Sequence, residues 1–267
     1  MTSPAPSIVP APVPKPNALF EYLQRLGDDR LILGHRLSEW CGHAPILEED
    51  IALANVALDL LGQATVFLRM AGEVDGQGRN EDALAYFREA VEFRNCQLVE
   101  LPNGDFGFTI ARQFLFDVYD VVLLDALTKS TNGELAGVAA KSLKEARYHV
   151  RHSGEWMLKL GDGTDESHRR VQTALDELWR FTSEFFAADE IDAELGASGV
   201  APDLAALKPQ WESLVREVLD RATLTTPIDV PRLPRARGGR SGAHTEHLGH
   251  LLAEMQIVAR SHPGAAW

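Results

Sequence analysis

Apolar residues recur at helical spacing along most of the chain, and no stretch alternates apolar and polar positions in the way a half-buried strand does. The pattern predicts helices over residues 17–26, 30–43, 47–71, 80–97, 109–128, 136–160, 164–186, 204–222 and 244–260, with a loop and a short turn over 189–202. Two of these helices, 47–71 and 109–128, are apolar on nearly every side, which is typical of helices in the middle of a bundle. The sequence therefore predicts an all-α protein built of long packed helices.

Capping and turn residues mark several of the predicted helix ends. The acidic residues 48–50 stand where a helix N-terminus favours negative charge, and Gly72 is expected to end that helix. The pair at 132–133, Asn-Gly, separates the next two long helices, and Thr164 is a good N-cap for the helix after them.

Two segments differ in composition from the helical part. Residues 1–16 carry six of the fourteen prolines and are expected to form a disordered tail, so that residues 17–267 make up a single helical domain. Residues 223–242 contain three prolines and four arginines, and they predict an extended basic segment before the last helix.

Charge and cysteine content narrow the function classes. With 26 basic and 39 acidic residues, the net charge of −13 argues against binding to nucleic acid or to an anionic membrane. The two cysteines, Cys41 and Cys96, give no disulfide framework and are expected to be small buried groups. We recognise neither a membrane span nor a secretory signal, and we expect a cytoplasmic protein.

Polar residues inside the apolar helices stand at intervals of one or two helical turns. They are His35, Glu39 and His43; Asn55, Asp59 and Gln63; Gln113, Asp117 and Asp120; and Glu145, His149 and His152. The helices 30–43, 47–71, 109–128 and 136–160 are expected to form a four-helix core, to which each contributes a carboxylate. Four carboxylates that converge from four helices are the arrangement of a dinuclear metal site in a ferritin-like bundle.

The ligand pattern of such a site is incomplete here. A complete site takes Glu from two helices and Glu-x-x-His from the other two. In this sequence Asp59 is followed by Gly62 at the histidine position, and Glu145 is followed by Tyr148, with His149 one residue late and turned by about 100°.

We therefore interpret the polar positions as vestigial. We expect Glu39, Asp59, Asp117 and Glu145 to approach one another beside His149 without bound metal, although Asp120 is an alternative to Asp117. Basic or hydrogen-bonding neighbours should match their charges, because an unpaired buried carboxylate is costly. The candidate basic partners are Arg36, Arg112, Lys144 and Arg147.

Three long stretches resemble a known family. They are LEEDIALANVALDLLGQA, EARYHVRHSGEWMLKLGDGTDESHRRVQ and GGRSGAHTEHLGHLLAEMQ, and they are similar to the C subunits of bacterial ring-1,2-phenylacetyl-CoA epoxidases, ferritin-like multicomponent monooxygenases. The resemblance covers the chain from about Leu19 to Trp267, leaving only the proline-rich tail outside.

The resemblance implies a ferritin-like four-helix bundle with additional flanking helices and a place in aerobic phenylacetate catabolism. In that family a catalytic A subunit holds the di-iron centre and binds phenylacetyl-CoA, and the C subunit pairs with it as a heterodimer within a higher oligomer. A small B subunit bridges the assembly, and a reductase with FAD and an iron–sulfur cluster delivers electrons from NADPH. The reaction places one oxygen atom of O2 across the aromatic ring.

Three functions are compared. The first is a structural, non-catalytic subunit without a cofactor of its own. The second is an active di-iron or di-manganese oxygenase or oxidase with Glu39, Asp59, Asp117, Glu145 and His149 as ligands, and the third is an iron-storage bundle. The missing histidine favours the first.

A long-lived heterodimer buries roughly 2,000 Å² or more, so we expect exposed apolar and aromatic residues on outer helix faces. The basic segment 232–240 is expected to lie along the surface, where it either reaches an acidic partner, holds the C-terminal helix or merely links two helices.

Overall fold

The computed structural model describes residues 17–227 and 236–265, and within these ranges the regular structure is entirely helical. The elements are α1 (Ala18–Ser38), α2 (Leu47–Asp75), α3 (Glu81–Tyr86), η1 (Ala90–Glu92), α4 (Gln97–Glu100), α5 (Phe106–Leu127), α6 (Gly133–Gly161), α7 (Asp165–Leu178), η2 (Trp179–Phe186), α8 (Glu190–Ala197), α9 (Leu204–Arg221), η3 (Gly239–Ser241) and α10 (Glu246–Ser261). The all-α prediction is confirmed. The proline-rich tail and Arg232 and Arg235 of the basic segment lie outside the described residues.

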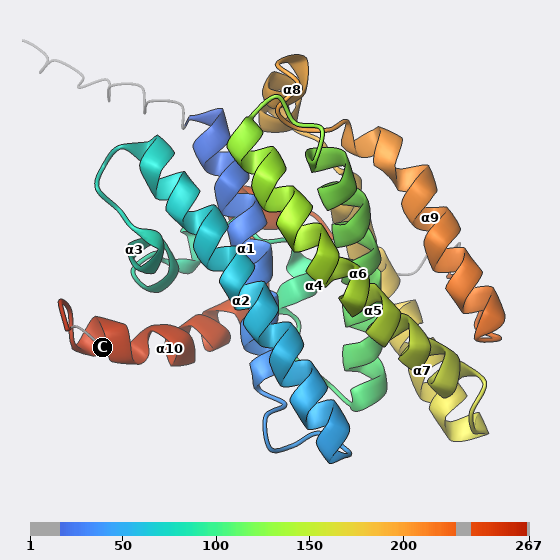
Figure 1. Ribbon diagram of the computed structural model, residues 1–267. Coiled ribbons are helices and arrows are strands. Elements are labelled where there is room, and N and C mark those ends of the chain that lie inside the picture. The colour runs from blue at the N-terminus through green and yellow to red at the C-terminus, as the bar shows by residue number, and fades with distance from the viewer. Residues whose placement is uncertain (1–16, 228–235, 266–267) are drawn as a thin grey trace, which may run out of the picture.

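Four long helices form a bundle (Figure 1). In cross-section they lie at the corners of a square, in the order α1, α2, α6, α5. Side-chain contacts fix the directions, because Gln63 bonds Glu145 and Asp59 bonds His149, so α2 and α6 run antiparallel. Neighbouring helices are antiparallel throughout, and α2 and α5 on one diagonal run the same way. The connection between α2 and α5 must therefore cross the length of the bundle, as in ferritin-like folds.

The helix α1 is continuous, where the sequence pattern predicted a break near residue 27 and a second helix to residue 43. Gly27 and Gly34 allow α2 to pack closely, since a Cβ on Gly27 would lie 2.7 Å from Leu68 Cδ2. Asp28 and Asp29 continue the helix although both are buried, because neighbouring segments supply partners for their carboxylates. The first core helix is thus residues 18–38.

The segment predicted as one helix over residues 80–97 is instead divided into the short helix α3, the 3-10 helix η1 and non-helical residues between and after them. The backbone N–H of Arg94 donates to Asp28 at 2.8 Å, and that of Cys96 donates to Asp29 at 2.8 Å. Since those N–H groups bond α1, they are not available to a continuous helix. The crossing connection is therefore attached to the bundle through two carboxylates of α1.

The other helix ends follow capping chemistry. Thr164 caps α7, as predicted, and forms a capping box with Ser167. Asn132 caps α6 by accepting from the backbone of Leu135. α2 extends beyond Gly72 and ends at Gly76, whose left-handed φ of 66° closes the helix.

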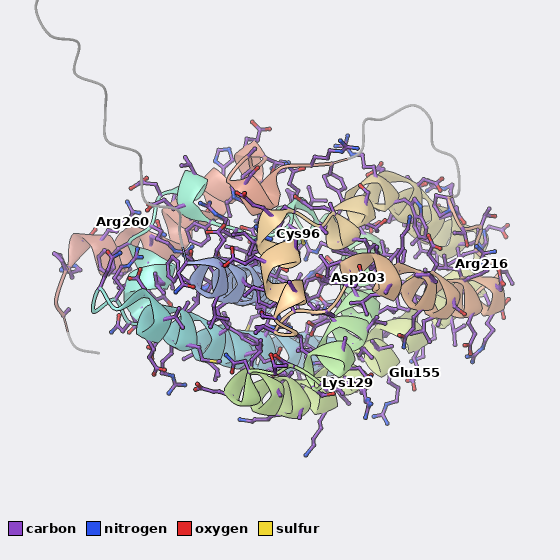
Figure 2. All side chains as sticks on the ribbon, turned by 90° about the horizontal axis from the view of Figure 1, so that it is seen from above. Cys96, Lys129, Glu155, Asp203, Arg216 and Arg260 are labelled. Carbon is purple, nitrogen blue, oxygen red and sulfur yellow. The ribbon has the colours of Figure 1, made fainter. Side chains whose placement is uncertain are left out.

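Shorter helices flank the bundle on the side formed by α5 and α6. α7, η2 and α9 pack there around Trp211, whose indole N–H donates to the Leu115 carbonyl at 3.1 Å. The short turn expected in residues 189–202 is the eight-residue helix α8. Figure 2 shows Cys96 inside the molecule and the α10 end at Arg260 far from the Lys129 end of the bundle.

The C-terminal segment is held to the bundle by buried charges. The Arg240 guanidinium donates to both carboxylate oxygens of Asp29, at 2.9 and 2.7 Å, and the Gly239 N–H donates to Glu184 at 2.7 Å. The described end of the basic segment thus holds the C-terminal helix in place, and the Arg240 side chain is only 15% exposed where a surface position was expected.

The free thiols differ in burial. Cys96 is buried, as predicted, but Cys41 is exposed in the loop after α1. Burial raises the pKa of the Cys96 thiol well above its usual range. In the described part of the chain, α2 is the helix that is long and apolar enough to cross a membrane by length and composition, and it packs against α1 in the bundle.

His244, just before α10, makes a pH-dependent contact between the C-terminal segment and the rest of the molecule. Its Nδ1 lies 2.8 Å from a Glu100 carboxylate oxygen and its Nε2 lies 3.0 Å from the Phe93 carbonyl, so both nitrogens face acceptors. Burial by itself lowers the pKa of His244, but the hydrogen bond and charge of Glu100 and the Phe93 carbonyl raise it overall. Both contacts are satisfied together only by the imidazolium form.

We expect His244→Gln to lower the free energy of unfolding by about 1–3 kcal/mol at pH 6. Because the folded-state pKa is raised, the wild-type contribution is complete below about pH 6.5 and is lost as pH rises through the folded value. Hydrogen exchange of the α10 amides at pH 6 and 8.5 measures the stabilisation that His244 contributes at each pH. His250→Gln, at an exposed position of α10, is the control. Equal pH dependence in wild type and His244→Gln would contradict the assignment.

Candidate functional site

A buried arginine joins all four helices of the bundle. Arg30 of α1 donates from Nε to Gln63 Oε1 of α2 at 2.8 Å and from Nη2 to Asp120 of α5. Gln63 Nε2 in turn donates to Glu145 of α6 at 2.8 Å. The Arg30 side chain is 1% exposed, and its guanidinium also lies 4.8 Å from the ring centre of Phe67. The network thus satisfies a buried positive charge with groups from the three other helices.

A second polar group lies about one turn along the bundle. Asp117 accepts from Gln113 Nε2 at 2.6 Å and from Ser153 Oγ at 2.7 Å, and all three side chains are buried. His149 of α6 lies 3.1 Å from Asp59 of α2, through its Nε2. The carboxylates of this group therefore have hydrogen-bond partners from side chains, as predicted.

Burial controls the ionisation of the two α5 carboxyls. It raises the pKa of Asp117 to about 7, while the charge of His149 and the hydrogen bonds from Ser153 and Gln113 act in the opposite direction. Burial also raises the pKa of Asp120, and Arg30 offsets part of that rise. Asp120 carries a direct ion pair with Arg30, whereas Asp117 carries neutral donors, so Asp117 is the carboxyl that takes up a proton near neutral pH.

The structure brings together four of the five predicted positions. Asp59, Asp117, Glu145 and His149 all belong to the central polar region of the bundle. Glu39 does not join them, because it caps the C-terminal end of α1 and lies nine residues, or about 13 Å, beyond Arg30.

Glu39 has partners of its own at that end of the helix. Its carboxylate bonds Arg36 at 2.8 Å and Asn103 at 3.0 Å and is 41% exposed. The prediction that Glu39 approaches the other carboxylates is therefore wrong. It depended on a helix from 30 to 43, and α1 ends at Ser38 instead.

The basic partners also differ from those expected. Arg36 bonds Glu39 and the Glu100 carbonyl, Arg112 bonds the Leu101 carbonyl and Asn103, and Lys144 and Arg147 are exposed on α6. The positive charge that pairs with Asp120 in the centre of the bundle comes from Arg30, which was not among the predicted partners. An available signal was a single arginine directly before the apolar residues 31–33, but the Gly-Asp-Asp before it was interpreted as a helix break.

The residues in this region do not fit a dinuclear metal centre. A cation, the guanidinium of Arg30, already lies among the side chains that would have to supply ligands, and it bonds Asp120 directly. Glu145 accepts from an amide and Asp59 contacts His149, so the two carboxylates are directed at different neighbours. Among the described residues, no three His, Cys, Asp or Glu side chains are arranged to hold a metal ion.

The histidine positions of the ligand pattern also lie on the wrong side of their helices. Gly62 is exposed on α2, and Tyr148 is 46% exposed on α6. The nearby His152 is bonded to Glu49 of α2 at 2.9 Å. Neither α2 nor α6 therefore supplies a Glu-x-x-His pair to the interior.

Fold and site together define a ferritin-like bundle with a buried ion pair where such bundles place metal ligands. The chain belongs to the phenylacetic acid catabolic protein family, whose model matches residues 9–267. A relative in Escherichia coli (strain K12), the C subunit of 1,2-phenylacetyl-CoA epoxidase, is 50% identical over 251 residues, which are 94% of this chain and 100% of the relative.

Replacing Arg30 tests how far the fold depends on the ion pair. We expect Arg30→Met to lower the free energy of unfolding by roughly 3–5 kcal/mol, because it leaves the charge of Asp120 buried without its partner. The double variant Arg30→Met/Asp120→Asn should recover part of this loss. Chemical denaturation measures both, with Arg169→Met as the control, since the Arg169–Glu166 pair lies on the surface of α7. A single variant as stable as the control would contradict the role of Arg30.

The protonation of Asp117 predicts a second pH dependence. Because its folded-state pKa is raised, its contribution is most favourable at low pH and becomes less favourable between about pH 4 and 7. The Asn side chain of Asp117→Asn can donate to Gln113 Oε1, which lacks a partner, and accept from Ser153. We therefore expect this variant to lose less stability than wild type between pH 5 and 8 by denaturant titration. Identical slopes would exclude the assignment, and Asp176→Asn on the surface of α7 is the control.

Proposed function

We propose that this chain is the structural, non-catalytic subunit of a phenylacetyl-CoA epoxidase, a multicomponent monooxygenase of aerobic phenylacetate catabolism. The full-length likeness to a C subunit supports this proposal. The observation that carries it is Arg30, because a fixed cation bonded to Asp120 occupies the region where a catalytic bundle of this fold holds metal.

In this proposal the chemistry belongs to the other subunits. The catalytic A subunit holds the di-iron centre and the thioester substrate, and this chain pairs with it as a heterodimer within a larger assembly. A small B subunit and a reductase with FAD, an iron–sulfur cluster and NADPH complete the cytoplasmic complex. This chain itself takes no cofactor.

The contribution of a structural subunit is a surface of fixed shape. A bundle cross-linked by an ion pair and neutral hydrogen bonds keeps its helix positions whether or not iron is supplied. The catalytic partner, in contrast, gains stability when its metal binds. This chain can therefore hold the catalytic one in place before and after metal loading.

A second candidate is a di-metal oxygenase or oxidase in this chain. The observation in its favour is that Asp59, Asp117, Glu145 and His149 share one region of the core. Glu145→Gln separates the two candidates, because Gln keeps an acceptor for Gln63 but is a poor metal ligand. The proposed function predicts unchanged iron content and unchanged kcat of the assembled complex with this variant.

Metal analysis and reconstitution test the proposed function. We expect this chain purified alone to contain little iron, and the complex to contain the iron of its A subunit only. The A subunit alone should lose most of its epoxidation activity, and added wild-type chain should restore it. Separate elution of the two chains at micromolar concentration, together with full activity of the A subunit alone, would overturn the proposal, as would stoichiometric iron in this chain.

A further inference from the structure

The helix α2 is far more apolar than its packing within this chain requires. Only 44% of its most apolar 18-residue window is buried. The inner side of α2 packs on α1, whereas its outer side presents Leu47, Ile51 and Leu58, which are 72%, 55% and 66% exposed. Large apolar residues that recur along one exposed helix stripe are typical of a surface covered by another molecule.

The neighbouring helix α6 adds an aromatic residue and a row of cations to this surface. Tyr148 is 46% exposed, and the guanidinium of Arg151 lies 5.3 Å from its ring centre. Lys144 and Arg147 are exposed on the same stripe, and Arg147 also lies 3.6 Å from the carboxylate of Asp125 on α5. Since Asp59 contacts His149 at 3.1 Å, the adjoining Leu58 and Tyr148 stand at the same height along the two helices.

We call this surface the α2–α6 face, with Leu47, Ile51, Leu58, Lys144, Arg147, Tyr148 and Arg151 as its residues. Figure 1 views the molecule onto it, with α2 and α6 in front of α1 and α5. Seen from above in Figure 2, the two helices line one edge of the molecule, and α10 lies at the opposite edge. Within the described part of the chain, α7 and α9 contact α6 as well as α5, and α3 contacts α2, but the residues that define this face stay exposed.

The composition of the face distinguishes between possible occupants. A membrane is disfavoured because the protein carries a net charge of −13 and because Asp59, 40% exposed at the seam between the helices, would enter the apolar layer. A second copy of this chain is disfavoured for either direction of a two-fold axis in the face: an axis across the helices brings the basic row near its own counterpart, and an axis along them places that row over the apolar stripe of the copy. An apolar stripe beside a basic row instead complements a protein whose own stripe is flanked by carboxylates.

We propose that the α2–α6 face is the docking surface for the catalytic subunit of the epoxidase. This inference rests on the proposed function, and it adds the surface and the chemistry of the partner. The partner presents a helix with an apolar stripe that covers Ile51 and Leu58, and acidic side chains opposite Lys144, Arg147 and Arg151. The apolar contacts supply most of the affinity, and the charges set the orientation and the rate of association.

A rival patch on the other side of the molecule provides matched controls. Phe87, Val91, Ile257 and Val258, beside α3 and on α10, are 48%, 67%, 60% and 53% exposed. Leu58→Asp and Ile257→Asp therefore place the same charge on two exposed helix positions of similar accessibility. Neither change buries a charge in the separate chain, so both variants are expected to fold.

The experiment measures the dissociation constant of the A subunit with each variant by calorimetry. We expect Leu58→Asp to raise Kd at least about 30-fold and Ile257→Asp to leave it within about threefold. Loss of binding with Ile257→Asp but not with Leu58→Asp would overturn the inference while leaving the proposed function intact. If the wild-type chain does not bind the A subunit at all, the proposed function itself fails.

Charge reversal tests the basic row independently. Arg147→Glu should slow association and weaken its dependence on salt, because it removes a favourable long-range attraction. Arg169→Glu on α7 is the matched control, since its side chain is 64% exposed, close to the 62% of Arg147. Equal association rates for the two variants would contradict the predicted acidic partner surface.

The same variants exclude the other occupants. Sedimentation of the wild-type chain at increasing concentration should show no dimer that Leu58→Asp dissociates. Flotation with vesicles that contain anionic phosphatidylserine should leave the protein in the lower fraction. A dimer broken by Leu58→Asp, or vesicle binding lost in Arg147→Glu, would assign the face to a second copy or to a membrane and overturn the inference.

Discussion

The ion pair between Arg30 and Asp120 is the constraint on which the bundle depends. A guanidinium inside a helical core is tolerated only when an opposite charge and hydrogen-bond acceptors surround it. Here Asp120 supplies the charge, and Gln63 and the Leu26 carbonyl accept the other hydrogen bonds of Arg30. Gln63 in turn donates a hydrogen bond to Glu145 on the fourth helix, α6. One side chain thereby fixes the relative heights of α1, α2, α5 and α6, a task that metal ligands perform in catalytic bundles of this architecture.

Buried carboxylates of α1 organise the rest of the chain in a similar way. Asp28 bonds Arg88 and the backbone of Arg94, and Asp29 bonds Arg240 and the backbone of Cys96. The crossing connection between α2 and α5 and the C-terminal segment are therefore held by the same turn of one helix. Polar groups in this interior consequently act as fixed cross-links, each satisfied from a segment distant in sequence.

The functional proposal follows from this division between interior and surface. The interior is crossed by an ion pair and hydrogen bonds between the helices, whereas the outer side of α2 and α6 exposes Leu58 and Tyr148 beside a basic row. Structural subunits combine these two properties, because their role depends on presenting a constant face to a partner. Under the proposed function, affinity for the partner and stability of the bundle depend on different residues, so that each can be changed separately.

Helix positions and the character of the central residues could be predicted from local signals in the sequence. Periodicity located α2, α5 and α6, and ligand spacing identified Asp59, Glu145 and His149 as members of an incomplete metal pattern, because both signals are confined to one helix. The central place of Arg30 and the position of Glu39 outside the core became visible only in the folded chain. Both depend on contacts between segments far apart in sequence, which extend α1 through a Gly-Asp-Asp that local propensity disfavours and supply each buried charge with its partner.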